Sequence, residues 1–159
     1  MDRSGMIGFL SFLLGWALAV SVFMQVFGLP WLSGAYAEQY PDLAGMRWPL
    51  MTLAIIGFCC VETGVVCTLR LLRFTARDEV FSSRSLRWVD GIIGSFLAGS
   101  LVSFSTIAYL DNAPAGPPFW LFVLLFTAVG GIGLALLMLV MRSLLVQATT
   151  LRNEMETVI

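Results

Sequence analysis

The sequence predicts an all-α integral membrane protein, a single domain of residues 1–159 folded as a four-helix bundle. Apolar residues make up 58% of the 159 residues, charged residues only 12%, and the mean hydropathy is +0.89. A soluble domain is about 45–50% apolar and about 25% charged, so this composition indicates a lipid environment. Four apolar stretches approach or exceed the roughly 20 residues that cross a bilayer core. They are residues 6–28, 49–69, 91–110 and 119–141.

The first stretch, residues 6–28, has no charged residue. It is longer than the roughly 7–15 apolar residues of a signal-peptide core, so we expect it to remain as an uncleaved membrane helix. The segment after it, residues 29–48, is bracketed by Pro30 and Pro49 and is predicted to form a structured cap.

The second stretch, residues 49–69, holds Glu62, the one charged residue within the four stretches. A carboxylate at mid-membrane costs about 2.5 kcal/mol or more, so Glu62 must be protonated, face water or find a partner. One interpretation is a proton- or cation-carrying site along hydroxyls of the third helix. The other is a neutral Glu62 that is hydrogen-bonded to one of these hydroxyls and holds helices together. The hydroxyls are those of Ser100, Ser103, Ser105 and Thr106.

Cys59, Cys60 and Cys67 also lie in the second stretch. They have no Cys-x-x-Cys spacing, and the chain has no His to complete a metal site. We therefore predict that they act as small buried apolar residues, and that the protein holds no metal or cofactor.

Small residues recur four positions apart in every stretch. In lipid, helices associate where small side chains let their backbones approach, so this spacing predicts one packing face on each helix. The Pro-rich link 111–118 is short enough to make the third and fourth helices antiparallel neighbours. The small residues are Ser11, Gly15 and Ala19; Cys60, Gly64 and Thr68; Gly91, Ser95, Gly99 and Ser103; and Thr127, Gly131 and Ala135.

Arginine positions predict the orientation in the membrane. Of the links and ends, residues 1–5, 70–90 and 142–159 carry eight arginines, whereas 29–48 and 111–118 carry only Arg47. The positive-inside rule then places both termini in the cytoplasm and the chain in the cell membrane. Aromatic residues gather at the opposite, outer boundary, as membrane interfaces favour. These are Trp31, Tyr36, Tyr40, Trp48, Tyr109 and Trp120.

The inner segments are predicted to be helical beyond the membrane. Arg70, Arg73 and Arg77 would share one face of an extended second helix, and Ser82 or Ser83 can start the next helix. After Arg142, apolar residues repeat with a period of 3.5, so the fourth helix is also expected to extend into the cytoplasm. The inner arginines either bind anionic lipid headgroups or form a docking surface for a cytoplasmic partner. They are Arg70, Arg73, Arg77, Arg84, Arg87 and Arg152.

Two inner-face segments carry a family resemblance. The first runs through CTLRLLR (67–73), VFS (80–82) and LRWVD (86–90), and the second through GGIG (130–133), MR (141–142), QAT (147–149), LRNEM (151–155) and the final VI. The chain resembles the bacterial four-span membrane proteins of domain-of-unknown-function family 2975, in the form common in actinobacteria. No activity is established for that family, and its members are often encoded beside a small helix-turn-helix regulator. The resemblance therefore implies a membrane partner for a cytoplasmic protein.

Three functional hypotheses follow. The sequence has no His base, phosphate-binding loop or nucleophile elbow, and its net charge of -1 does not favour direct nucleic-acid binding. The leading hypothesis is therefore a non-enzymatic membrane protein that regulates or binds a cytoplasmic protein through its inner face. The first alternative is a small oligomeric, proton-linked transporter or channel that uses Glu62. The second is an accessory subunit of a larger membrane complex.

Overall fold

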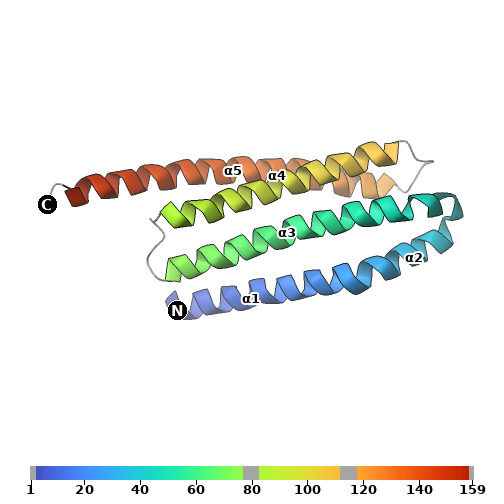
Figure 1. The fold of residues 1–159 in the computed structure, drawn as a ribbon, viewed down its shortest axis with the longest axis horizontal. Helices are drawn as coiled ribbons and strands as arrows, with labels where there is room; N and C mark the ends of the chain where they lie inside the picture. The colour runs from blue at the N-terminus through green and yellow to red at the C-terminus, as the bar shows by residue number, and fades with distance from the viewer. Residues whose placement is uncertain (1–2, 77–82, 112–117, 158–159) are drawn as a thin grey trace.

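The computed structural model describes residues 3–76, 83–111 and 118–157, and confirms an all-α fold over these residues (Figure 1). Within them, four helical stretches are long and apolar enough to cross a membrane: Gly5–Gln39, Ala44–Phe74, Ser85–Asp111 and Phe119–Leu151. The elements are α1 Arg3–Phe23, the π-helical η1 Met24–Gly28, α2 Leu29–Gln39, the 3-10 helix η2 Pro41–Met46, α3 Arg47–Ala76, α4 Ser83–Asp111 and α5 Pro118–Thr157.

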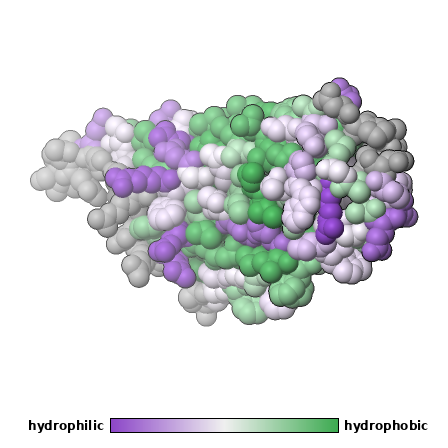
Figure 2. All heavy atoms as spheres, turned by 45° about the vertical axis from the view of Figure 1, so that its right-hand side comes forward, coloured by the Kyte–Doolittle hydropathy of each residue, from purple (hydrophilic) through white to green (hydrophobic). Residues whose placement is uncertain are grey.

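The helices lie side by side, and each packs mainly on the next one along the chain (Figure 1). The extensive interfaces are α3 with α4 and α4 with α5, whereas α1 has a smaller interface with α3. Among the described residues, α1 and α5 form no packed interface with each other. An apolar band lies between polar groups at the two ends of the molecule (Figure 2). We call these the arginine-rich end (Arg70, Arg73, Arg87, Arg142) and the aromatic end (Trp31, Tyr36, Tyr40, Trp48, Trp120).

Small residues bring α3 and α4 together, as the spacing predicted. A Cβ atom on Gly64 would lie 2.8 Å from Ser95 Oγ, and one on Gly91 would lie 2.8 Å from Cys67 Sγ. Such distances leave no room for a larger side chain on either glycine. Cys67 is buried in this interface, which agrees with its predicted role as a small buried apolar residue. Cys60 is only half-buried and Cys59 is exposed, so the prediction of burial is wrong for Cys59.

The contact between α4 and α5 is closer still. A Cβ atom on Gly131 would lie 2.3 Å from Ser100 Oγ and 3.3 Å from the backbone oxygen of Phe96. Ala135, one turn further along α5, has no exposed surface and packs with Val89 and Ile93 in a buried apolar cluster. The core of the molecule therefore lies between α4 and α5, towards the arginine-rich end.

The small residues of α1 do not pack in this way. A Cβ atom on Gly15 would have no neighbouring atom within 4 Å, and Ala19 is exposed. The expectation of a tight face on every helix is therefore wrong for α1. Small side chains permit close approach but do not enforce it, and α1 instead contacts α3 through polar side chains described below.

The predicted cap, residues 29–48, continues the first helix. Pro30 cannot donate a backbone hydrogen bond and its ring crowds the preceding turn, which normally breaks or kinks a helix. Here η1 widens the helix immediately before Pro30, and π-helical turns are one way in which a helix absorbs such a disruption. The chain then turns back through η2 into α3.

Two helices extend beyond the predicted spans, as expected. α3 reaches Ala76, and α5 runs for 40 residues to Thr157. At about 1.5 Å per residue α5 is about 60 Å long, roughly twice the hydrocarbon thickness of a bilayer. Figure 1 shows its C-terminal part reaching past the ends of α3 and α4, at the end where both termini lie.

Gly131→Ala is expected to destabilise the protein by about 1–3 kcal/mol, because the new methyl group must displace Ser100 or the backbone at Phe96. The control is Gly133→Ala on the same helix, where a Cβ atom meets nothing within 4 Å. Unfolding of both variants in detergent, followed by circular dichroism, makes the comparison. Equal stability of the two variants would contradict the described interface.

Candidate functional site

Glu62 lies on the face of α3 that contacts α1. Ser21 of α1 donates a hydrogen bond from its Oγ to Glu62 Oε1 at 3.3 Å. The expected partners on α4 are therefore wrong: each of their hydroxyls donates to its own helix. Ser100 donates to the oxygen of Phe96 at 2.9 Å, Ser103 to Gly99 at 3.0 Å, Ser105 to Leu101 at 2.9 Å and Thr106 to Val102 at 2.8 Å.

Helical geometry explains this correction. Cys60 faces α4, where its Cβ lies 3.8 Å from the Cβ position of Gly99. Glu62 follows two residues later, which turns it by about 200° around the helix axis. Its carboxylate therefore points away from α4 and towards α1, whereas Ser100 faces α5 at Gly131.

Gln25, which the sequence analysis did not single out, lies beside Glu62 in the same interface. Its Nε2 donates to the backbone oxygen of Ile55 at 3.2 Å and lies 3.4 Å from Cys59 Sγ. Gln25 is part of η1, and π-helical turns often occur at functional sites. Ser21, Gln25, Cys59 and Glu62 form what we call the polar seam between α1 and α3. A single uncharged Gln after a long apolar run does not by itself indicate a site. Its contact with α3 becomes evident only when the position of η1 along α3 is known.

The polar seam has limited chemistry. It offers one carboxyl, one amide, one hydroxyl and one thiol. Across the described part of the chain, no group of three or more His, Cys, Asp or Glu side chains could hold a metal ion. Hydrogen bonds between side chains of membrane helices contribute about 0.6 kcal/mol on average, so the seam fastens α1 to α3 only modestly.

At the arginine-rich end, two arginines tie helices together. Arg142 of α5 forms a bidentate ion pair with Asp90 of α4: its Nε donates to Oδ1, and its Nη2 donates to Oδ2 at 3.3 Å. The guanidinium of Arg70 lies 5.7 Å from the ring centre of Trp88, a cation–π contact between α3 and α4. These contacts fix the ends of three helices relative to one another.

The inner arginines whose side chains the structure describes are exposed to solvent, except for their contacts with other helices. Arg73 and Arg87 are exposed, and so is Arg70 despite its contact with Trp88. Arg77 lies outside the described residues. Arg84 and Arg152 lie in α4 and α5, but their side chains are not among those described.

Beyond Arg142, α5 carries an exposed apolar surface, as the period of 3.5 predicted. Leu144, Leu151 and Met155 share one face of the helix and are 54%, 60% and 66% exposed. Leu145 instead packs against the buried cluster of Val89 and Ile93. We call Leu144, Leu151 and Met155 the apolar stripe.

Together these observations define a helical membrane protein with four membrane-length helices, a polar seam and an exposed arginine-rich end. A sequence profile of a family described as a protein of unknown function, DUF2975, matches residues 31–159. The chain belongs to this family, which confirms the resemblance. The matched residues exclude α1 and η1, and therefore also Ser21 and Gln25. No curated protein and no solved structure has significant similarity to the chain.

Gln25→Leu is expected to loosen α1, because it removes two contacts with α3. Amides in α1 should exchange with deuterium several-fold faster, as a loss of about 1 kcal/mol in local opening energy implies. The control is Ser11→Ala, which alters the same helix away from the seam. Unchanged exchange in Gln25→Leu would show that the seam does not hold α1 in place.

Proposed function

We propose that the protein is a non-enzymatic membrane module that binds a cytoplasmic protein at its arginine-rich end. The apolar stripe on the projecting part of α5 is the observation that carries this proposal. Membrane helices expose apolar side chains to lipid, but Leu151 and Met155 lie about 15 and about 21 Å past the end of the predicted span 119–141, where water would surround them, and Leu144 lies at its margin. A contiguous apolar face in water favours association with another protein. The arginine bias supports the cytoplasm as the compartment and the cell membrane as the location.

The chemistry of the surface suggests what the partner presents. An exposed apolar helix face is typically covered by an amphipathic helix that inserts side chains at i, i+3, i+4 and i+7 spacing. The exposed Arg73 and Arg87 lie at the same end and favour acidic side chains on that helix. A small helix-turn-helix regulator, the kind of protein often encoded beside members of the family, is the first candidate.

The double variant Leu151→Glu and Met155→Glu is expected to weaken partner binding at least about tenfold, since it places charges in the centre of the contact. The full-length protein is purified from native membranes in mild detergent, and proteins that co-purify at stoichiometric ratio are identified by mass spectrometry. The partner is then purified, and its affinity is measured against the protein in nanodiscs.

Thr150→Glu is the control for this experiment, because it adds a charge to an exposed position of α5 that points about 100° or more away from the stripe residues around the helix axis. Equal affinity of the double variant and the control would refute the proposed surface. A partner that is itself an integral membrane protein and binds independently of the stripe would instead indicate an accessory subunit.

The proton-linked transporter is the alternative proposal, and the place of Glu62 favours it. The carboxyl lies at the interface with α1, the helix with the smallest packing interface of the membrane-length helices described. This hypothesis expects Glu62→Gln to abolish proton-driven flux in proteoliposomes without loss of folded protein. If Glu62→Gln instead behaves like Ser21→Ala, with a small loss of stability and no change in proton permeability, Glu62 is a structural residue.

A further inference from the structure

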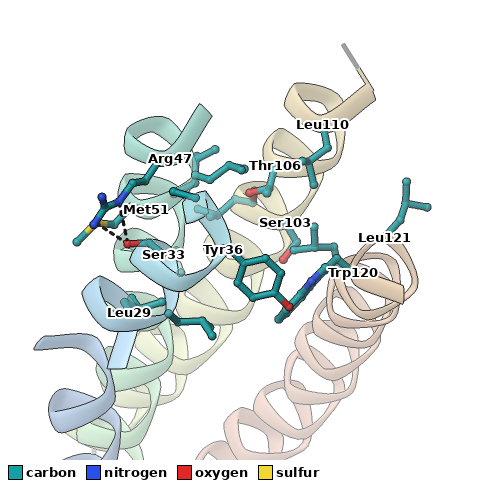
Figure 3. Close-up of a pocket in the computed structure, with 18 of the residues that line it drawn as sticks. Leu29, Ser33, Tyr36, Arg47, Met51, Ser103, Thr106, Leu110, Trp120 and Leu121 are labelled. Atoms are coloured by element: carbon teal, nitrogen blue, oxygen red, sulfur yellow. Dashed lines mark hydrogen bonds between the residues drawn. The ribbon is translucent and has the colours of Figure 1, made fainter. Parts of the chain in front are cut away.

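A cavity of about 650 Å³ lies at the aromatic end, among α2, α3, α4 and α5 (Figure 3). Its volume falls within the range of about 300–1,000 Å³ that is typical of small-molecule sites. Tyr36 of α2 and Trp120 of α5 meet edge to face, with ring centres 6.1 Å apart. This contact joins α2 to α5 across one side of the cavity.

The walls of the cavity are apolar below its rim. α3 contributes Leu53 and Ala54, and α4 and α5 contribute Val102 and Leu124. The hydroxyls of Ser103 and Thr106 also line it, but both donate to carbonyls of their own helix. Neither of these two hydroxyls therefore demands a polar ligand, and hydrocarbon can fill the space beside them; the phenols of Tyr36 and Tyr40 also line the cavity.

The depth of the cavity matches one leaflet of a bilayer. Its lining runs along α3 from Arg47 to Gly57, ten residues or about 15 Å. This is half of the roughly 30 Å hydrocarbon core. Next to the Tyr36–Trp120 contact, α1 and α5 form no packed interface in the described part of the chain, so the ring of helices is open beside the cavity. A hydrocarbon chain that enters from the surrounding lipid fits both the length and the chemistry.

The rim carries charges of both signs. Arg47 donates from Nε to Ser33 Oγ at 3.2 Å, and its guanidinium lies 5.8 Å from the ring centre of Trp48. Asp111, at the end of α4, also lines the cavity. A guanidinium at the membrane surface suits a phosphate, and a carboxylate that lines the same cavity suits an ammonium group. This pair complements a zwitterionic headgroup.

We propose that the cavity is a phospholipid site, which holds one acyl chain among α2, α3, α4 and α5 and the headgroup phosphate at Arg47. The ammonium group of phosphatidylethanolamine then lies on the side of Asp111. The proposal is independent of the partner surface, which lies at the opposite end of the molecule. Loss of either function therefore leaves the other intact.

Native mass spectrometry of the full-length protein in detergent, titrated with phosphatidylethanolamine, tests the cavity. Ala54→Phe fills the space and is expected to lower the affinity of the first bound lipid at least about tenfold. The control is Ala98→Phe, at an exposed position of α4 that does not line the cavity. Circular dichroism verifies that both variants are folded.

Arg47→Gln tests the headgroup without altering the cavity walls. It is expected to weaken phosphatidylethanolamine about five- to tenfold and to leave an uncharged diacylglycerol glycolipid unchanged. Equal binding of the lipid to the wild type, Ala54→Phe and Arg47→Gln overturns the proposal. So does a protein dimer that Ala54→Phe abolishes, since a second copy would then occupy the cavity.

Discussion

The close approach of three backbones, those of α3, α4 and α5, is the constraint on which the rest of the structure depends. Lipid supplies no hydrophobic drive for helices to associate, so the fold relies on contacts made where side chains are small. Gly64, Gly91 and Gly131 provide these contacts, and α4 takes part in each of them. α4 is enclosed on two sides by α3 and α5, and the polar seam lies on the other side of α3, where it meets α1.

Much of this arrangement is encoded locally and could be predicted from the sequence. Apolar runs define the membrane-length helices, and four-residue spacing identifies the packing faces of α3, α4 and α5. The period after Arg142 shows that α5 continues. These features repeat within one helix, so they can be recognised without knowledge of its neighbours. The same spacing misled for α1, because Gly15 permits a contact that no other helix makes.

The sites depend on the rotation of one helix against another, which is harder to derive. Once Cys60 is assigned to the face that meets α4, Glu62 must point elsewhere, yet only the position of α1 identifies Ser21 as its partner. The contact that Gln25 makes with α3 depends further on the π-helical turn η1. This turn changes the direction in which the side chains point around the helix axis, and a hydropathy pattern does not reveal that change. The cavity combines residues from four helices. No single segment of sequence contains its pattern.

The length of α5 has a mechanical consequence. The Asp90–Arg142 ion pair fixes the helix close to where it leaves the apolar core, and about 22 Å of helix follows before Thr157. A continuous helix of this length transmits rotation as a lever does. A tilt of about 10° at the ion pair moves the tip by about 4 Å, roughly three-quarters of the rise of one helical turn. Small adjustments between α4 and α5 within the bilayer are thereby magnified at the far end of the chain.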